Sequence, residues 1–205
     1  MKYRVLFRYI APTLLWCAAA HAATISTFNF DNDALGTSTT FTDTDNGLSA
    51  IFSSSADPGG FVVYPSMFET LTGNVLGDPG PAGANNIALD INFSQDLSAL
   101  TFDFATADFS TPSPLTLQAF ENSTLVGSTT FPGQFLPGFN FPEGEIAFSG
   151  ATFNNVVIST TAPDFAVDNI QAIAATTAPE PGTLGMMAAG VLLSGIGVLR
   201  RRRQQ

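Results

Sequence analysis

Residues 38–54 read STTFTDTDNGLSAIFSS, in which two strand-like segments flank an Asp-Asn-Gly turn. Asn46 and Gly47 both tolerate the positive φ angles of a two-residue turn, so this stretch predicts a β-hairpin. Short runs rich in Phe, Val, Ile and Thr, separated by Gly, Pro, Asn and Asp, continue along the chain and are typical of strands. The segment 23–178 has no sustained helical periodicity, which indicates an all-β domain.

The pattern predicts about ten short strands with loop-rich connections. The expected strands cover residues 24–30, 38–44, 48–54, 61–64, 86–93, 99–105, 115–121, 124–131, 145–149, 153–160 and 165–174. Residues 73–85 are rich in Gly and Pro and are expected to form a long loop. Because no fixed-period repeat is visible, we expect a two-sheet antiparallel β-sandwich of jelly-roll type.

The charges are divided unevenly along the chain. All seven basic residues lie at the two ends, sixteen of the seventeen acidic residues lie between residues 31 and 168, and the net charge is −10. The only Trp, Cys and His are Trp16, Cys17 and His21. The region 23–178 therefore lacks a basic groove for nucleic acid, a histidine-dependent nucleophile, a Schiff-base lysine, a Cys/His zinc site and a disulfide.

The first 22 residues have the organisation of a secretory signal peptide. A basic segment precedes an apolar run over residues 9–19, and Ala20-His21-Ala22 follows as an A-x-A cleavage site. We expect export by the Sec machinery and cleavage before Ala23, with cleavage before His21 as the alternative. The sequence thus predicts a signal peptide over 1–22, an acidic β-sandwich domain over 23–178 and a C-terminal tail over 179–205.

The tail combines a short motif, an apolar stretch and a basic cluster. In order these are Pro179-Glu180-Pro181, the uncharged residues 183–199, and Arg200, Arg201, Arg202 and Arg203. As a helix the apolar stretch would be about 25 Å long, slightly short of the roughly 30 Å hydrocarbon core. The arginines should stay cytoplasmic by the positive-inside rule. We therefore expect a transmembrane helix that leaves the domain outside the cytoplasm.

This order of features resembles the PEP-CTERM sorting signal of Gram-negative bacteria. The resemblance implies that exosortase, a membrane-embedded thiol protease, reads the Pro-Glu-Pro motif and removes the tail. The protein would be anchored in the inner membrane on its periplasmic side before processing, and would then reach the outer surface or the extracellular matrix. The resemblance also implies an association with exopolysaccharide and biofilm formation. An ordinary C-terminal membrane anchor is the alternative.

The domain resembles galactose-binding-like sandwiches and carbohydrate-binding modules. The resemblance rests on residues 87–94, 115–120, 150–153 and 165–170. It implies a glycan partner and a structural calcium ion near the junction of the first and last strands.

Three aspartates could supply that calcium site. Asp31 and Asp33 follow the first expected strand and Asp168 lies in the last, and carboxylate oxygens are preferred calcium ligands. We expect these three residues to converge on a calcium ion. The alternative is that Asp31 and Asp33 are turn residues and Asp168 is an outward strand position.

Apart from carboxylates, the domain offers only one tyrosine, Tyr64, and hydroxyl groups, so we expect hydrolysis here to require a pair of carboxylates. Glu143 and Glu145, with Asp90, Asp103 or Asp108, are the residues that could form such a pair. A Pro-Glu-Gly sequence is common in solvated turns, so we assign no catalytic residue. The sequence predicts a non-enzymatic binding or structural protein; a carboxylate-based glycan hydrolase and a plain membrane-anchored spacer are the alternatives.

A Pro-rich segment carries four phenylalanines, Phe131, Phe135, Phe139 and Phe141. Its proline content argues against a central strand. We expect this segment to form a lid over one end of the sandwich, with an exposed apolar contact surface as the alternative.

Overall fold

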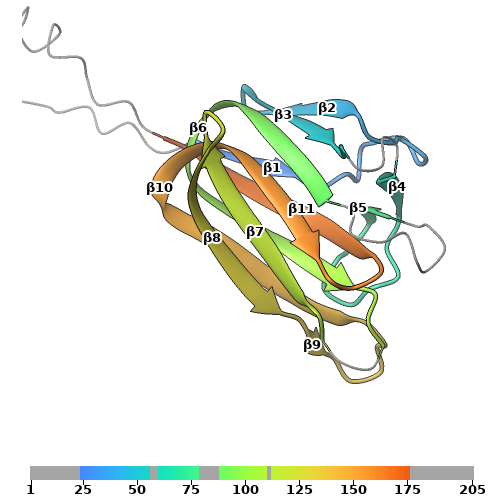
Figure 1. Cartoon of the computed structure of the whole chain (residues 1–205). Coiled ribbons are helices and arrows are strands. Elements are labelled where there is room, and N and C mark those ends of the chain that lie inside the picture. The colour runs from blue at the N-terminus through green and yellow to red at the C-terminus, as the bar shows by residue number, and fades with distance from the viewer. Residues whose placement is uncertain (1–23, 56–59, 79–87, 110–111, 176–205) are drawn as a thin grey trace, which may run out of the picture.

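The computed structural model describes residues 24–55, 60–78, 88–109 and 112–175. Within these ranges the chain forms eleven strands in one hydrogen-bonded antiparallel network (Figure 1). The predicted fold class, an antiparallel sandwich of jelly-roll type, is confirmed. The strands are β1 (Ile25–Phe28), β2 (Phe41–Asp45), β3 (Leu48–Ser53), β4 (Val62–Pro65), β5 (Asn74–Gly77), β6 (Ala88–Thr106), β7 (Pro114–Glu121), β8 (Thr124–Pro132), β9 (Gln134–Phe135), β10 (Pro142–Thr160) and β11 (Phe165–Ala174).

The hairpin predicted from residues 38–54 is confirmed. Asn46 and Gly47 join β2 to β3 with φ angles of 49° and 81°. Both values are positive, as a two-residue hairpin turn with the twist of its strands requires.

Two pairs of expected strands are single long strands. β6 covers the expected segments 86–93 and 99–105, and β10 covers 145–149 and 153–160. Polar residues at 94–96 and the Ser149-Gly150 pair interrupt the hydrophobic alternation, but the ladder between the two strands resumes after each interruption through register shifts. The sequence-based boundaries were wrong there because a β-bulge breaks the pattern of side chains without ending the strand.

Two strands were missed altogether, the two-residue β9 and β5. Residues 74–77 were expected to lie in a loop, and they form β5, which pairs with β4 and with the start of β11. The segment contains Gly73 and Gly77, which dilute its strand signal. Short strands of this kind are specified by their neighbours more than by their own residues.

The strands form two layers that share β6 and β10. In the first layer the order is β2, β3, the first half of β6, the second half of β10, β7 and β8. In the second layer β11 pairs with β1 and β5 on one side and with the second half of β6 on the other, followed by the first half of β10 and β9. The two expected sheets are therefore one continuous sheet that folds over on itself.

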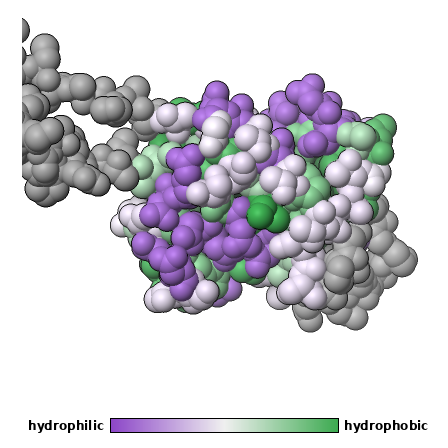
Figure 2. Space-filling view, turned by 90° about the horizontal axis from the view of Figure 1, so that it is seen from above, coloured by the Kyte–Doolittle hydropathy of each residue, from purple (hydrophilic) through white to green (hydrophobic). Residues whose placement is uncertain are grey.

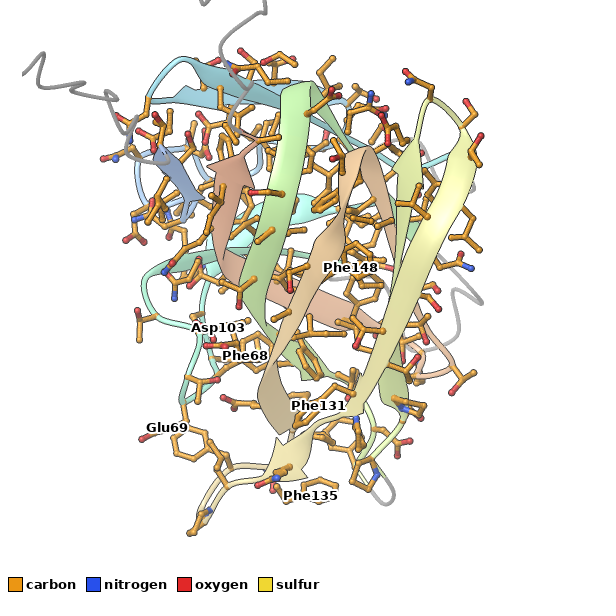
Figure 3. All side chains as sticks on the ribbon, turned by 90° about the vertical axis from the view of Figure 1, so that its left-hand side faces the viewer. Phe68, Glu69, Asp103, Phe131, Phe135 and Phe148 are labelled. Atoms are coloured by element: carbon orange, nitrogen blue, oxygen red, sulfur yellow. The ribbon has the colours of Figure 1, made fainter. Side chains whose placement is uncertain are left out.

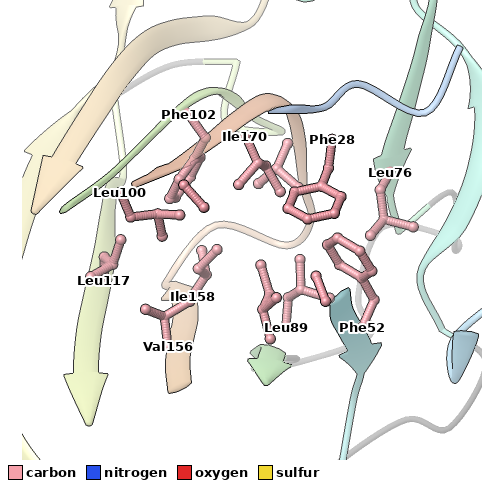
Figure 4. Packing of buried hydrophobic residues seen from close by; sticks show 14 of the residues in the cluster. Phe28, Phe52, Leu76, Leu89, Leu100, Phe102, Leu117, Val156, Ile158 and Ile170 are labelled. Carbon is pink, nitrogen blue, oxygen red and sulfur yellow. The ribbon is translucent and has the colours of Figure 1, made fainter. Parts of the chain in front are cut away.

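The core lies between these layers and is built from alternate residues of each strand (Figure 4). Phe52, Leu89 and Ile158 point inward from the first layer, and Phe102 and Ile170 point inward from the second. Each of these side chains is almost completely buried, and burial of one such side chain contributes about 1.5–3 kcal/mol to stability. In β6 the core-facing residues are odd-numbered up to Leu97 and even-numbered from Leu100, so the irregularity between its two halves exchanges the inward and outward positions.

The Pro-rich phenylalanine segment divides between the two predicted roles. Phe131 packs edge-to-face on Phe104, with ring centroids 6.3 Å apart, and Phe141 packs on Phe68 at 5.1 Å. Phe135, on the short strand β9, is 41% exposed (Figure 3). The segment packs on the sandwich through Phe131 and Phe141, as a lid would, but it exposes apolar surface at Phe135 and also at Phe131, which is 37% exposed.

In the described ranges, no helix has the length and apolar character needed to cross a bilayer. The signal peptide with its Ala20 and Ala22 cleavage site, the sorting motif, the expected span 183–199 and the arginine cluster lie outside the described residues.

Candidate functional site

A polar hollow of about 550 Å³ lies on the outer face of the first layer. Because Leu89, Ile91 and Val156 point into the core, the residues between them on β6 and β10 face outward. The hollow extends to the β7–β8 turn, at the end of the molecule seen from above in Figure 2, where hydrophilic residues gather. It is lined by Asp90, Asn92, Phe93, Phe120, Asn122, Ser123, Asn154, Asn155 and Val157.

Asp90 is the centre of a hydrogen-bond network in this hollow. Its Oδ1 accepts hydrogen bonds from Asn92 Nδ2 at 2.8 Å and from Asn155 Nδ2 at 2.5 Å. Asn155 Nδ2 also lies 3.3 Å from the carbonyl oxygen of Ile91, which it donates to. These bonds hold a carboxylate and two amide groups in fixed positions while their remaining acceptors and donors stay available to a ligand.

A second network forms the wall beside the β7–β8 turn. Asn122 and Ser123 have positive φ angles of 47° and 69°, as a tight hairpin turn requires. Asn154 Nδ2 donates to Asn122 Oδ1 and to Asp96 Oδ1, both at 3.3 Å, and Asn154 Oδ1 accepts from the backbone N–H of Asn122 at 3.2 Å. The turn is thereby tied to β10 and to the bend of β6.

The apolar part of the hollow is the half-buried ring of Phe120. Its cross-strand neighbour is Leu125, which is 52% exposed. A ring next to fixed amides and a carboxylate offers a hydrophobic surface and directional hydrogen bonds in one place. The lining as a whole is mainly polar, and its carboxylate and amide groups can exchange hydrogen bonds with a ligand.

The outer face of the second layer carries an acidic row, Glu145, Asp103 and Asp168. Asp103 is the cross-strand partner of Glu145 on β10 and of Asp168 on β11. Figure 3 shows Asp103 beside the segment that carries Phe68 and Glu69. Three like charges on adjacent strands repel one another, so this row needs protons, hydrogen bonds or a cation.

Asp168 is the buried member of the acidic row, with no exposed surface. Its Oδ2 accepts from the backbone N–H of Thr72 at 3.2 Å and its Oδ1 from that of Asn169 at 2.7 Å. Burial, followed by the charges of Asp31 and Asp103, outweighs these bonds and raises the pKa of Asp168 to about 7. Burial also raises the pKa of Asp103, although Asn169 Nδ2 donates to its Oδ2 at 3.0 Å.

Asp31 and Asp33 interact with different residues. Asp31 Oδ1 accepts from the backbone N–H of Asn74 at 2.8 Å, and its charge acts on Asp168. A Cβ at position 73 would lie 1.8 Å from Asp31 Oδ1, so Gly73 is required for this approach. Asp33 instead faces Asp43, whose charge adds to burial in raising the pKa of Asp33.

The structure thus brings Asp31 and Asp168 together with Asp103 and leaves Asp33 apart. Within the described ranges, no cluster of three or more His, Cys, Asp or Glu has an arrangement that could hold a metal ion. The calcium site expected from Asp31, Asp33 and Asp168 stays a prediction, with Asp31 and Asp168 as its best-placed ligands. Asp103, which the sequence offered only as a catalytic partner, is the cross-strand neighbour of Asp168.

Glu143 is not the solvated turn residue that its Pro-Glu-Gly context predicted. It lies in β10 and is 2% exposed. Its carboxylate accepts from the backbone N–H groups of Glu69, at 3.0 and 3.1 Å, and Thr70, at 2.7 Å, and from Thr70 Oγ1 at 2.7 Å. These contacts occupy Glu143 as a structural clamp that holds the 66–72 loop on the second layer, whereas Glu145 is exposed.

The comparisons with known proteins bear on the tail and on the fold. The PEP-CTERM protein-sorting motif matches residues 177–203, which include Pro179, Glu180, Pro181 and the four arginines, so the predicted sorting signal is present. No curated protein matches the chain. The predicted likeness to carbohydrate-binding sandwiches is found among the solved structures.

Two similar solved structures illustrate that likeness. One is a cleaved adhesin domain of Lys-gingipain from Porphyromonas gingivalis, with a TM-score of 0.47, 10% identity, and coverage of 75% of this chain and 99% of that chain. The other is a family 35 carbohydrate-binding module from Clostridium thermocellum, with a TM-score of 0.40, 14% identity, and coverage of 75% and 100%. No site residue is transferred from either.

The sequence did not predict the polar hollow, although it offered Asp90 as a possible member of a catalytic carboxylate pair. The available signal was the outward Asp90-Ile91-Asn92 pattern together with Asn154-Asn155, because asparagine is unusual in the middle of strands. That β6 and β10 pair at these positions follows from the fold and not from the local sequence.

Proposed function

We propose that this protein is an exported cell-surface or extracellular-matrix protein of a Gram-negative bacterium whose β-sandwich binds a neutral glycan in the polar hollow. The hollow combines the fixed carboxylate of Asp90, the amides of Asn92 and Asn155, and the ring of Phe120. This pre-ordered set of hydrogen-bonding groups next to one ring is the observation that carries the proposal. It can pair with sugar hydroxyls while the ring covers the C–H face of a pyranose.

The proposed location follows from the tail. The sorting motif over 177–203 supports export through Sec, anchoring in the inner membrane on the periplasmic side, and processing by exosortase. The released domain would then associate with exopolysaccharide at the outer surface or in the matrix. Its net negative charge disfavours anionic polymers, which is a further reason to propose a neutral glycan.

We propose binding and not hydrolysis at this hollow. A glycosidase of the common type needs two carboxylates on opposite sides of the scissile bond. Asp90 is the single acidic residue among the described residues that line the hollow, and Asn92 and Asn155 both bond to it. Glu143, one of the acids that the sequence offered for catalysis, is clamped on the opposite layer.

The glycan proposal can be tested with the purified domain, residues 23–178, by retention in gels that contain neutral or acidic polysaccharides. Wild type should be retarded by a neutral glycan and should release no sugar from it. Phe120→Ala should lose most of the retardation, and Leu35→Ala, which removes a 60% exposed side chain outside the hollow, should not. Equal retardation of both variants, or sugar release by wild type, would contradict the proposal.

The sorting proposal makes a separate prediction about mass. The surface form isolated from the native host should lack Arg200 to Arg203 and all residues beyond the processing site, because the Pro-Glu-Pro motif acts as a processing address. Intact-mass measurement decides the question. A surface form that retains the four arginines would reduce the tail to a plain anchor.

A further inference from the structure

A second pocket, of about 530 Å³, lies on the outer face of the second layer and shares no lining residue with the polar hollow. Its floor includes Ala105 of β6 and Ala166 of β11, and Tyr64 of β4 forms one side. We call it the acidic aromatic pocket because its lining combines rings with two carboxylates. The full lining is Tyr64, Met67, Phe68, Asp78, Ala105, Ala107, Phe109, Phe141, Pro163, Asp164, Phe165 and Ala166.

Three phenylalanines form the aromatic wall. The ring of Phe141 lies 5.1 Å from that of Phe68 at an interplanar angle of 75°, and 5.2 Å from that of Phe109 at 51°. Phe109 is 67% exposed and Met67 is 61% exposed, although both line the pocket. All three rings line the pocket, and aromatic rings attract cations to their faces.

Two carboxylates, those of Asp78 and Asp164, also line the pocket. Burial, and next the charge of Asp78, raises the pKa of Asp164. In the described part of the chain, Asp164 Oδ1 is buried and accepts no hydrogen bond. Both carboxylates also act on Tyr64, whose pKa burial raises to about 12, so its phenol is a neutral donor at physiological pH.

The position of Tyr64 depends on a close approach to β5. A Cβ at Gly77 would lie 2.7 Å from Tyr64 Oη, so the glycine leaves room for the phenol at the pocket's edge. Tyr64 is thereby kept beside the acidic pair without filling the pocket.

The sandwich itself has no cationic side chain that could pair with Asp78 and Asp164. All Lys and Arg residues of the chain lie at positions 2–8 and 200–203, and the single His is His21. A positive charge that pairs with Asp78 and Asp164 must therefore come from outside the sandwich. Asp78 and Asp164 give this largely apolar pocket a negative charge, so a ligand that joins a positive charge to an apolar stem complements both parts of its lining.

We infer that the acidic aromatic pocket binds an arginine side chain that a partner protein presents between apolar residues. The planar guanidinium stacks on aromatic rings and donates in a fork to carboxylates, and its methylene stem covers apolar surface. A neutral sugar fits worse, because the side chains of this pocket offer two carboxylates and one phenol and otherwise only apolar surface. The domain would then join a glycan on one layer to a protein on the other.

Two short peptides test the inference with the purified 23–178 domain, which contains the whole core. They are acetyl-Leu-Arg-Leu-amide and the same peptide with citrulline, the neutral isostere, in place of arginine. Calorimetric titration at low salt should show binding of the arginine peptide that is about tenfold tighter than that of the citrulline peptide. The affinity should fall as sodium chloride is raised, because the contact is between opposite charges.

Two variants assign the binding to this pocket. Phe109→Ala, at a largely exposed position, should fold normally and weaken binding of the arginine peptide about fivefold, and Asp164→Asn about tenfold. Leu35→Ala and Asp90→Asn should leave it unchanged, because neither residue lines the pocket.

Three results would overturn the inference. They are equal affinity for the arginine and citrulline peptides, no binding of either, and preferential binding of a glucosamine oligosaccharide over the arginine peptide. Because Asp90→Asn affects only the polar hollow, a failure here is distinguishable from a failure of the glycan proposal.

Discussion

The two outer faces of the sandwich use the same residue types for opposite purposes. On the first layer, Asp90 and its amide partners are open to solvent in the polar hollow. On the second layer, Asp168 and Glu143 are buried beneath the segment that runs from β4 to β5 and accept hydrogen bonds from its backbone. Asp90 lies on a bare sheet face, and Asp168 lies on one that a loop covers.

This difference indicates where stability and binding reside. A carboxylate that accepts several backbone N–H groups in a buried site holds the structure together, and its removal leaves those donors unsatisfied. A carboxylate held only by exposed amides contributes little to folding and remains available to a ligand. The second layer should therefore respond to mutation in stability, and the first layer in binding.

The largest expected effect is that of Glu143→Gln. The substitution places an NH₂ group where the carboxylate accepts from Glu69 and Thr70, and we expect a loss of about 2–4 kcal/mol in the free energy of unfolding. Glu145→Gln, two residues away and exposed, should change it by less than about 0.5 kcal/mol. Urea denaturation measures the free energy of unfolding of both variants. Equal losses in the two would show that the hydrogen bonds of Glu143 do not stabilise the fold.

Calcium should stabilise the second layer if Asp31 and Asp168 bind it as predicted. Binding to the folded state alone contributes about 2.7 kcal/mol at a hundredfold excess over Kd, or several degrees in Tm for a domain of this size. Melting is compared in millimolar calcium, in chelator and in sodium chloride of matched ionic strength. Asp168→Asn should abolish the calcium effect. A gain no larger than that in matched sodium chloride would mean screening alone.

The stability of the domain, measured in chelator, should fall as pH rises. The pKa of Asp168 is about 7 in the folded state and 3.8 for an unperturbed aspartate, so the folded protein holds this proton more tightly than the unfolded chain. The contribution of Asp168 is favourable below about pH 4 and is lost as pH rises to about 7. Asp168→Asn should flatten the fall in Tm over this interval, and Asp96→Asn, on an exposed bend, serves as the control. A slope unchanged in Asp168→Asn would contradict this assignment.

The smallest expected effect on stability is that of Asp90→Asn. The new amide can still accept a hydrogen bond from Asn92 or Asn155, so we expect a change of about 0.5–1 kcal/mol or less. The same variant should weaken glycan binding, because the carboxylate is lost from the centre of the hollow. A loss of stability as large as that of Glu143→Gln would remove the contrast between the two faces.

The sequence predicted the fold class and most strands because alternation and turn chemistry are local properties. The β2–β3 hairpin and β11 were found from their own residues, and β11 was placed with its observed limits. β5 and the continuity of β6 and β10 were missed because pairing partners, and not propensity, decide them. The sorting tail was predicted because its signal is linear.

The sites were less predictable because they depend on distant pairings. Asp168 was placed correctly in the last strand, and its role as a calcium ligand stays a prediction, but its neighbour Asp103 lies 65 positions earlier and is brought to it only by the β6–β11 register. Glu143 was taken for a surface residue because the 66–72 loop that buries it leaves no mark on the local sequence. Asp78 and Asp164 meet at the acidic aromatic pocket for the same reason.

The central claim is that the outer face of the first layer is the glycan site. An NMR titration tests it directly. The isotope-labelled 23–178 domain is titrated with a neutral exopolysaccharide from the native host, and shifts of the backbone amide resonances are followed. The account predicts that the largest shifts occur at Asp90, Phe120, Asn122 and Asn155, with little change at Thr70 and Asp168. Shifts centred on Tyr64 and Phe109 instead, or no shifts at saturating glycan, would contradict it.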